Sequence, residues 1–369
     1  MDVICERDLW EYLADTNKRI VMYGMGNGAD KILKACDAKG ITVSDFFASD
    51  GFVRGHFFHG KKVLTWGEVK QKYGAENIIA LLSFGTSRPE VLENIFRIAG
   101  EAELYAPDVP AFGDGLFDRA FFELHRAELE EVETLLCDEE SRRIFENVIK
   151  FKLTGDIRCL AIAESDPVEA METLVRPKEI RVAADLGAYN GDTVRELLRA
   201  CGGSVKTVYA MEPDARNFRK LQAYAEEERR ANVIPVAAGA WSEMTMLYFD
   251  GSGNRNASFG SNRSDTLADR PVKLTEINAD TLDRVLDGAA VDYIKYDVEG
   301  SEREALLGSA GTVRAYMPTL LVSLYHRNED IFDLPLLIKR EFPAYRGFYM
   351  RRFAGIPAWD LNLYCRKEG

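Results

Sequence analysis

Two acidic side chains directly follow an apolar segment late in the chain. Residues 293–296 are expected to form a strand, and Asp297 and Glu299 come after it, ahead of a helix that begins at Glu302. The carboxyl ends of parallel strands form the edge at which α/β proteins bind ligands. Carboxylates at that edge suit two roles, a general base toward a hydroxyl group or a ligand of a divalent cation. Glu302 is expected only to cap its helix.

His326 follows a second apolar segment, residues 319–324, which is also expected to be a strand. An imidazole with a pKa near neutrality could take a proton from a hydroxyl group there. The alternative is that His326 is a polar loop residue without a catalytic role.

A glycine turn stands where a third strand meets a helix. The strand over residues 182–185 ends in Asp185-Leu-Gly187-Ala188-Tyr189-Asn-Gly191-Asp192-Thr193, and Asp192 and Thr193 occupy positions that favour helix caps. Glycine has no Cβ, so such a turn brings backbone N–H groups and a helix start close to a ligand. A nucleotide-like ligand is expected, although glycines also occur in strand-turn-helix units that bind nothing.

Glu212-Pro213 ends the next apolar strand, 27 positions after Asp185 (212 minus 185). A carboxylate at that point can accept both hydroxyl groups of a ribose. Further along, Ala238 lies among small residues that would let an adenine ring lie flat against the chain. These features together point to S-adenosylmethionine as the ligand.

These motifs resemble the FkbM-type methyltransferases over about residues 180–325, most specifically in the string Lys295-Tyr-Asp297-Val-Glu299-Gly-Ser-Glu302. The resemblance implies a class I fold, S-adenosylmethionine as methyl donor and a hydroxyl acceptor on a sugar or other secondary metabolite. It also implies that Asp185, Gly187 and Glu212 hold the donor, while Asp297 and Glu299 face the reacting centre. The family commonly carries a Glu where this chain has Ser323. Whether the site holds a divalent metal is therefore left open.

The chain as a whole is expected to be α/β, with three parts. Residues 1–112 are expected to form a small Rossmann-like domain, 113–178 a helical connector that packs on the next domain, and 179–369 a seven-stranded class I methyltransferase domain. Within the last part, a helix over 279–286 capped by Asn278 is expected. Residues 250–265 are expected to be a loop, either a lid over the acceptor or a solvated hairpin.

The first part contains a second glycine turn, Gly24-Met-Gly26-Asn-Gly28, followed by an acid at Asp50. Its layout resembles the N-terminal sugar-nucleotide-binding domains of bacterial sugar acyltransferases. Two interpretations stay open, a nucleotide or nucleotide-sugar site and a purely structural or dimerising module.

Composition limits the partners. A formal net charge of -13 disfavours unspecific binding to nucleic acid or to an anionic membrane. The six cysteines show no metal or redox spacing, the start of the chain lacks a signal-peptide pattern, and no apolar run would span a bilayer. A cytoplasmic protein with a small-molecule acceptor, a sugar or nucleotide-sugar among the candidates, is expected.

The sequence leaves three alternative functions. The first is an S-adenosylmethionine-dependent O-methyltransferase in which Asp297 or His326 removes the proton. The second is a non-catalytic nucleotide or nucleotide-sugar binding protein that acts as a scaffold in polysaccharide assembly. The third, an NAD-dependent enzyme acting through Gly24–Gly28, is disfavoured by the incomplete glycine pattern. A homodimer is consistent with the first domain.

Overall fold

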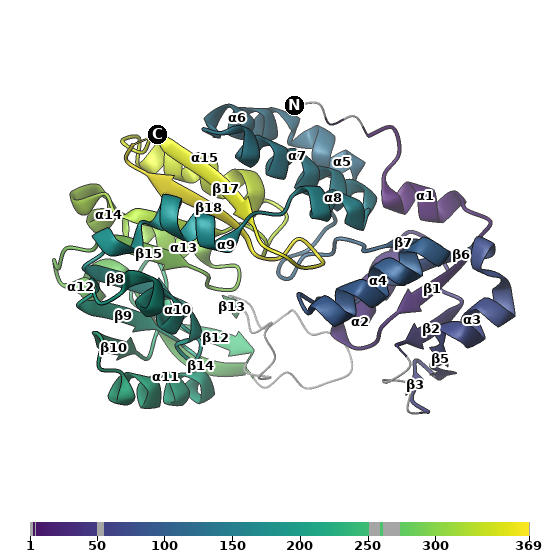
Figure 1. Cartoon of the computed structure of the whole chain (residues 1–369), viewed down its shortest axis with the longest axis horizontal. Helices are drawn as coiled ribbons and strands as arrows, with labels where there is room; N and C mark the ends of the chain where they lie inside the picture. Colours follow the sequence, from purple (N-terminus) through teal and green to yellow (C-terminus); the bar gives the residue numbers. More distant parts are fainter. Residues whose placement is uncertain (1–2, 4, 50–54, 251–258, 261–273, 369) are drawn as a thin grey trace.

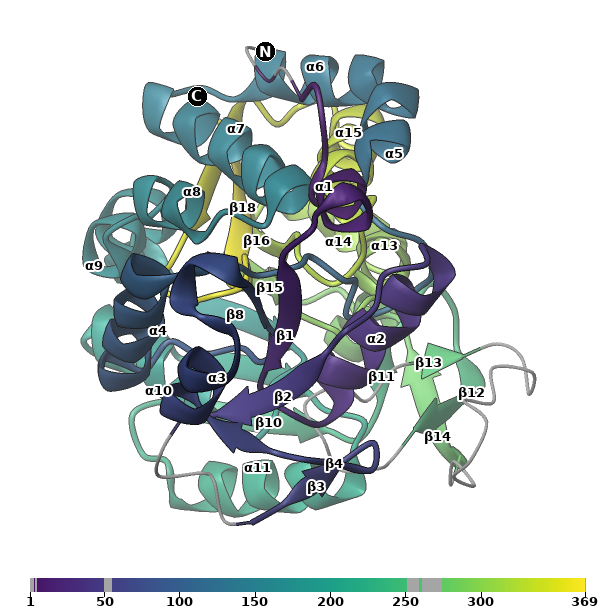
Figure 2. The ribbon, with the colours of Figure 1, turned by 90° about the vertical axis from the view of Figure 1, so that its right-hand side faces the viewer.

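Two separate β-sheets organise the chain in the computed structural model, which describes residues 3, 5–49, 55–250, 259–260 and 274–368. One sheet has five strands in the order β5-β2-β1-β6-β7, and the other has seven in the order β10-β9-β8-β15-β16-β18-β17. Figures 1 and 2 show the two sheets in adjacent halves of the molecule, with the helices α5 to α8 above them.

The five-stranded sheet and its helices form the N-terminal unit. All of its strand pairs are parallel, as expected for a Rossmann-like arrangement. Its elements are α1 (Leu9–Asp15), β1 (Arg19–Tyr23), α2 (Asn27–Ala38), β2 (Asp45–Ala48), β3 (Phe57–Phe58), β4 (Lys61–Lys62), β5 (Leu64–Thr65), α3 (Trp66–Tyr73), β6 (Ile78–Leu82), α4 (Pro89–Glu101) and β7 (Glu103–Tyr105). The predicted acid at Asp50 lies outside the described residues.

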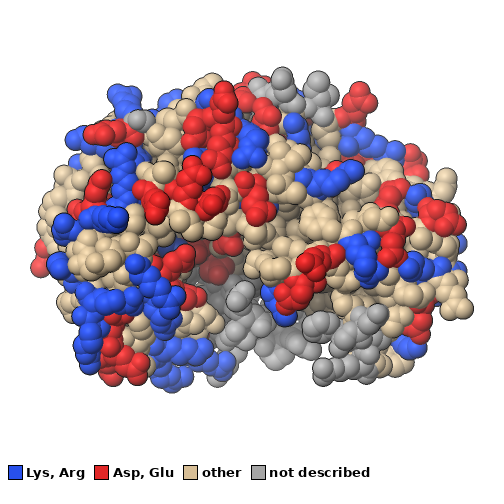
Figure 3. Space-filling model, in the orientation of Figure 1, with Lys and Arg blue, Asp and Glu red and all other residues tan. Residues whose placement is uncertain are grey.

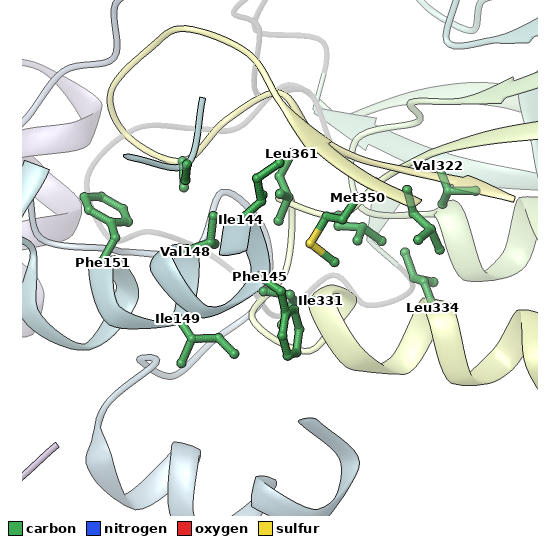
Figure 4. Packing of buried hydrophobic residues seen from close by; sticks show 14 of the residues in the cluster. Ile144, Phe145, Val148, Ile149, Phe151, Val322, Ile331, Leu334, Met350 and Leu361 are labelled. Carbon is green, nitrogen blue, oxygen red and sulfur yellow. The ribbon is translucent and has the colours of Figure 1, made fainter. Parts of the chain in front are cut away.

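A helical segment connects the two sheets. Its elements are α5 (Arg119–Leu124), α6 (Arg126–Leu135), α7 (Glu139–Thr154), α8 (Ile157–Ile162) and α9 (Pro167–Ala170), followed by a short π-helical turn, Met171–Val175, and a 3₁₀ turn, Pro177–Glu179. The apolar face of α7 packs against the last strands of the seven-stranded sheet, with Phe145 and Val148 near Met350 and Leu361 (Figure 4). Asp138, which caps α7, also pairs with the buried guanidinium of Arg351 at 2.7 Å.

The second half of the chain forms the seven-stranded sheet and a smaller sheet beside it. Strands β10, β9, β8, β15 and β16 run parallel, whereas β18 is antiparallel to both β16 and β17. The elements are β8 (Val182–Leu186), α10 (Asp192–Cys201), β9 (Thr207–Met211), α11 (Ala215–Glu227), β10 (Asn232–Val236), β11 (Gly239–Ala240), β12 (Thr245–Asp250), β13 (Phe259–Gly260), β14 (Leu274–Asp280), α12 (Leu282–Leu286), β15 (Tyr293–Tyr296), α13 (Glu302–Leu307), α14 (Ala310–Tyr316), β16 (Thr319–Ser323), α15 (Asp330–Glu341), β17 (Gly347–Arg352) and β18 (Leu361–Arg366).

One helix prediction is wrong. Residues 279 and 280 belong to β14, and α12 begins only at Leu282, with Thr281 as the cap in place of Asn278. The strand continues because its residues pair with β12 through Ala279 and with β11, a tertiary contact that no local pattern reveals. Most of the predicted loop 250–265 lies outside the described residues.

No helix in the described part of the chain is both long and apolar enough to cross a bilayer.

Candidate functional site

The first glycine turn lies against the acidic loop after β15. Strands β8 and β15 are neighbours, with Asp185 opposite Lys295 in the register. Gly187 has a φ of +87°, and a Cβ there would lie 1.9 Å from the backbone oxygen of Asp297. Gly187 is therefore required for contact between two parts of the chain, which differs from the expected contact with a ligand.

The start of α10 differs from the predicted cap. Gly191, in the left-handed conformation, is the cap residue, and no side chain caps the helix. Thr193 instead donates its hydroxyl to Asp185 Oδ2, and Asp192 Oδ1 accepts the backbone N–H of Thr193 at 2.9 Å. Thr193 thus holds Asp185 in place rather than capping the helix.

Asp185 is buried, and its two oxygens have different surroundings. Oδ2 accepts from Thr193, while Oδ1 has no hydrogen-bond partner among the described residues and lies 3.8 Å from Lys295 Nζ. Burial raises the pKa of Asp185, and the charge of Lys295 opposes that rise. A buried carboxylate oxygen without a donor is a place where a ligand can supply one.

Glu212 joins the turn to the next strand. Its Oε2 accepts the backbone N–H of Tyr189 at 2.9 Å, and its Oε1 accepts that of Asp214 at 2.8 Å. Burial raises the pKa of Glu212 to about 7, although these two hydrogen bonds lower it. Each carboxylate oxygen keeps a second lone pair for a hydroxyl group, so the predicted role toward a ribose fits this geometry.

The remaining predicted donor residues lie around the same turn. Tyr189 is 38% exposed and has a φ of 48°, whereas Ala188 and Ala238 are buried. Pro213 follows Glu212 and precedes the cap of α11 at Asp214. Because the N–H of Glu212 donates to Val236 at 3.0 Å, the end of β10, and Ala238 after it, lies beside the Glu212 loop.

Asp297 is held by donors on several sides. Its Oδ2 accepts from Lys295 Nζ at 2.9 Å, and its Oδ1 accepts from Ser323 Oγ at 3.0 Å and Tyr325 Oη at 2.9 Å. Burial raises its pKa, but the charges of Lys295 and His326 outweigh burial and hold the pKa of Asp297 well below its usual range. Such a carboxylate stays ionised and is a poor proton acceptor.

His326 is 1% exposed and is surrounded by three carboxylates. Its Nδ1 lies 2.8 Å from Glu302 Oε1, while Nε2 lies 3.4 Å from Glu299 Oε2 and 3.7 Å from Asp297 Oδ1. Burial lowers the pKa of His326, but the three carboxylates outweigh burial and raise it to about 10. At neutral pH this charge balance favours the protonated imidazole over the neutral base that the sequence suggested.

Glu299 differs from the other acids in its exposure. Its side chain is 41% exposed, and the residue has a φ of 55°, next to Gly300 with a φ of +88°. Burial raises its pKa to about 7, although the charge of His326 lowers it. Glu299 is thus the most exposed acid of this cluster, and its pKa is raised toward neutrality.

Glu302 does more than the predicted helix cap. It is 1% exposed, and its Oε1 accepts the backbone N–H of Val298 at 2.8 Å while also lying beside His326 Nδ1. It therefore fixes the loop that carries Glu299 and places a carboxylate beside the imidazole.

A divalent cation is chemically compatible with part of this cluster. Asp297, Glu302 and His326 offer ligand atoms within 4.8 Å of one another. A metal-bound histidine must be neutral, so a divalent cation would have to displace the proton that the carboxylates favour on His326. The proton on His326 therefore supplies the positive charge that a divalent cation would otherwise supply to these carboxylates.

Lys295, Tyr325 and Phe112 contact the cluster but were not predicted. The sequence could have indicated Lys295, because residues 295 and 297 lie two apart and so face the same side of the strand and its extension.

Phe112 comes from the other half of the molecule. Its N–H donates to the His326 carbonyl at 3.0 Å, and its ring lies 5.8 Å from the imidazole. In the view of Figure 3, acidic side chains gather in the hollow between the two halves.

The residues around Asp185 fit S-adenosylmethionine. They include a buried carboxylate oxygen that lacks a donor, the start of a ten-residue helix and, after the next strand, Glu212 with free lone pairs. Acids near the donor also suit the positive charge of a sulfonium group.

Comparison with known proteins supports this assignment. Residues 185–350 match the family described as the methyltransferase FkbM domain, so the predicted resemblance is confirmed and supports an S-adenosylmethionine-dependent methyltransferase. No curated protein matches the chain.

Among solved structures, a methyltransferase FkbM from Methylobacillus flagellatus KT is 19% identical, with 94% of this chain and 90% of that chain covered at a TM-score of 0.68. An Aeropyrum pernix fibrillarin with bound S-adenosyl-L-methionine is 15% identical, covers 50% of this chain and 66% of its own, and has a TM-score of 0.31. A SAM-dependent methyltransferase from Aquifex aeolicus is 12% identical, with 54% and 93% covered and a TM-score of 0.30. The first shows a shared fold over nearly the whole chain and confirms the predicted fold class.

Proposed function

We propose that this methyltransferase acts on oxygen, and that its acceptor is a hydroxyl group of a sugar, a nucleotide-sugar or a comparable secondary metabolite. Glu299 carries the proposal, because it is the most exposed carboxylate of the cluster and lies 3.4 Å from His326, and because burial raises its pKa to about 7. A general base is most effective when its pKa lies near the working pH. An amine or thiol acceptor would need less help in losing its proton than a hydroxyl group does.

When bound, S-adenosylmethionine supplies an electrophilic methyl group. Asp185 and Glu212 would hold it beside the glycine turn, where their carboxylates accept hydrogen bonds and balance positive charge. Asp297 would remain ionised beside Lys295 and keep the local charge fixed.

Glu299 would accept the proton of the acceptor hydroxyl group at Oε2. The His326 cation, 3.4 Å from that oxygen, orients the carboxylate and prevents its pKa from rising further. Asp297 and Glu302 keep the imidazole protonated, so the proton is expected to leave through Glu299 to solvent. This assigns the base to Glu299, with Asp297 and His326 in supporting roles.

The test is transfer of a labelled methyl group from S-adenosylmethionine to hydroxylated sugars, followed by product identification. An O-methyl ether product supports the proposal. A product methylated on nitrogen, sulfur or carbon contradicts it, provided that S-adenosylhomocysteine binds, as calorimetry would show.

The three-part division at residues 112 and 178, a cytoplasmic location and a homodimer remain predictions. Gel filtration with light scattering would test the last of these.

A further inference from the structure

A cavity of about 200 Å³ lies between the two halves of the molecule. Its walls come from the second glycine turn with the start of α2, the end of β6, residues 106–111 and the loop between β17 and β18. In the N-terminal sheet, β1 lies between β2 and β6, so this edge is the topological switch point at which α/β sheets bind ligands. Figure 1 shows the loop between β17 and β18 reaching from the seven-stranded sheet toward the N-terminal unit.

Two walls of the cavity continue directly into the catalytic cluster. Ala111 lines the cavity, and Phe112 after it packs against Gly300 and His326. Trp359 lines the other side, and Asp360 after it lies near Tyr325, which donates to Asp297. Two short segments of the chain thus connect the walls of the cavity to the carboxylate cluster.

The walls are built rigidly. Lys31 donates to the carbonyls of Pro110 at 3.0 Å and Ala111 at 2.6 Å, and Thr86 and Ile356 pair through two backbone hydrogen bonds, of 2.8 and 3.0 Å. The buried Arg352 donates to the Gly355 carbonyl at 3.0 Å, which fixes the loop that carries Trp359. A preformed cavity between two units is a usual place for a small-molecule site.

The chemistry of the lining suits a ring with one apolar face and a polar rim. Trp359 is 45% exposed although it lines the cavity, and Met25 and Phe84 add apolar surface. Asn27 and the third N–H of Lys31 can donate hydrogen bonds. Sugar rings present C–H groups on their faces and hydroxyl groups on their rims, and the volume accommodates one such ring.

We propose that this interdomain pocket binds a second ring of the acceptor, a sugar ring joined to the ring whose hydroxyl group faces Glu299. The inference rests on the proposed O-methylation and deepens it, since the acceptor becomes a glycan of at least two rings. The N-terminal unit is then part of the acceptor site.

The test uses saturation-transfer NMR in the presence of S-adenosylhomocysteine, with maltose, lactose and a mannobiose as probes beside the methyl glycosides of glucose, galactose and mannose. Asn27→Trp fills the rim of the pocket, and Trp359→Ala removes its aromatic wall. Lys34→Trp places the same bulk on an exposed position of the same helix and is the control. Thermal unfolding of each variant shows whether it folds.

We expect at least one disaccharide to bind more tightly than its methyl glycosides, in the wild type and in Lys34→Trp. Asn27→Trp and Trp359→Ala should weaken that binding by roughly fivefold, since an aromatic contact is worth about 1 kcal/mol. Equal binding of all probes to the wild type, or unchanged disaccharide binding in folded Asn27→Trp, overturns the inference.

Labelled methyl transfer to these sugars is measured separately. Equal rates for the disaccharides and the methyl glycosides overturn the inference alone, whereas a product methylated at an atom other than oxygen overturns the proposed function.

Discussion

Glu302 Oε1 lies 2.8 Å from His326 Nδ1, on the side of the imidazole away from Glu299. Both residues are 1% exposed, so the pair is shielded from water and salt. A buried cation of this kind needs its partner, because removal of one member leaves an uncompensated charge. The pair therefore determines the protonation of the ring that faces Glu299.

Glu302→Gln should lower kcat while donor affinity stays close to that of the wild type. The amide keeps the size of the side chain but removes one of the charges that keep His326 protonated. Turnover with a matched calorimetric titration of S-adenosylhomocysteine measures this, and the pH profile should shift because Glu299 loses part of its cationic partner. Glu304→Gln, on the same helix, is the control; equal pH profiles for both variants would contradict a positioning role.

His326 should remain protonated through pH 8 and titrate near pH 10, because three carboxylates raise its pKa to about 10. NMR of labelled histidine suits this test, as the chain has 4 histidines. Since the folded-state pKa is raised, the stabilisation from His326 is full below the unfolded pKa of about 6.5 and is lost as pH rises through 10. A His326 signal that titrates below pH 7 would show that the carboxylates do not hold the cation.

Glu299→Gln should reduce kcat by about 10²- to 10⁴-fold, the usual contribution of a general base, and leave donor binding intact. In the wild type, kcat/KM should rise as pH passes through about 7, because the ionised carboxylate accepts the proton. This rise of kcat/KM with pH should disappear in Glu299→Gln. Full turnover in Glu299→Gln would move the base to another group.

Glu212→Ala should weaken S-adenosylhomocysteine binding by about tenfold or more, since two hydroxyl groups would lose their acceptor. In the wild type, affinity should fall between pH 8 and 6, because Glu212, with a pKa of about 7, then becomes protonated. Calorimetry across this range measures both effects. Affinity that is independent of both pH and the substitution would exclude Glu212 from the donor site.

Chelation should leave turnover unchanged. The His326 cation already balances the carboxylates that a divalent ion would require, so EDTA treatment followed by dialysis is expected to have no effect on methyl transfer. Activity that is lost with EDTA and restored by Mg²⁺ or Mn²⁺ would show that a metal displaces the proton from His326.

Local patterns in the sequence predicted much of the fold. Strand β15 has the predicted bounds, Tyr293–Tyr296, the strand predicted at residues 182–185 is β8, and the carboxyl ends of β8, β9 and β15 present the predicted acids. These features depend on hydrophobic periodicity and caps within a few residues. The chain thereby determined which acids lie at the sheet edge.

Only the tertiary structure decided what those acids do. Ionisation depends on distances between residues far apart in the chain, such as Glu302 and His326, and on how deeply each is buried. Burial and neighbouring charges made His326 a cation, kept Asp297 ionised and brought the pKa of Glu299 to about 7. The sequence thus determined which groups are available at this edge, and the fold determined their charges, because electrostatic energies are set by spatial separation and solvent exposure rather than by order along the chain.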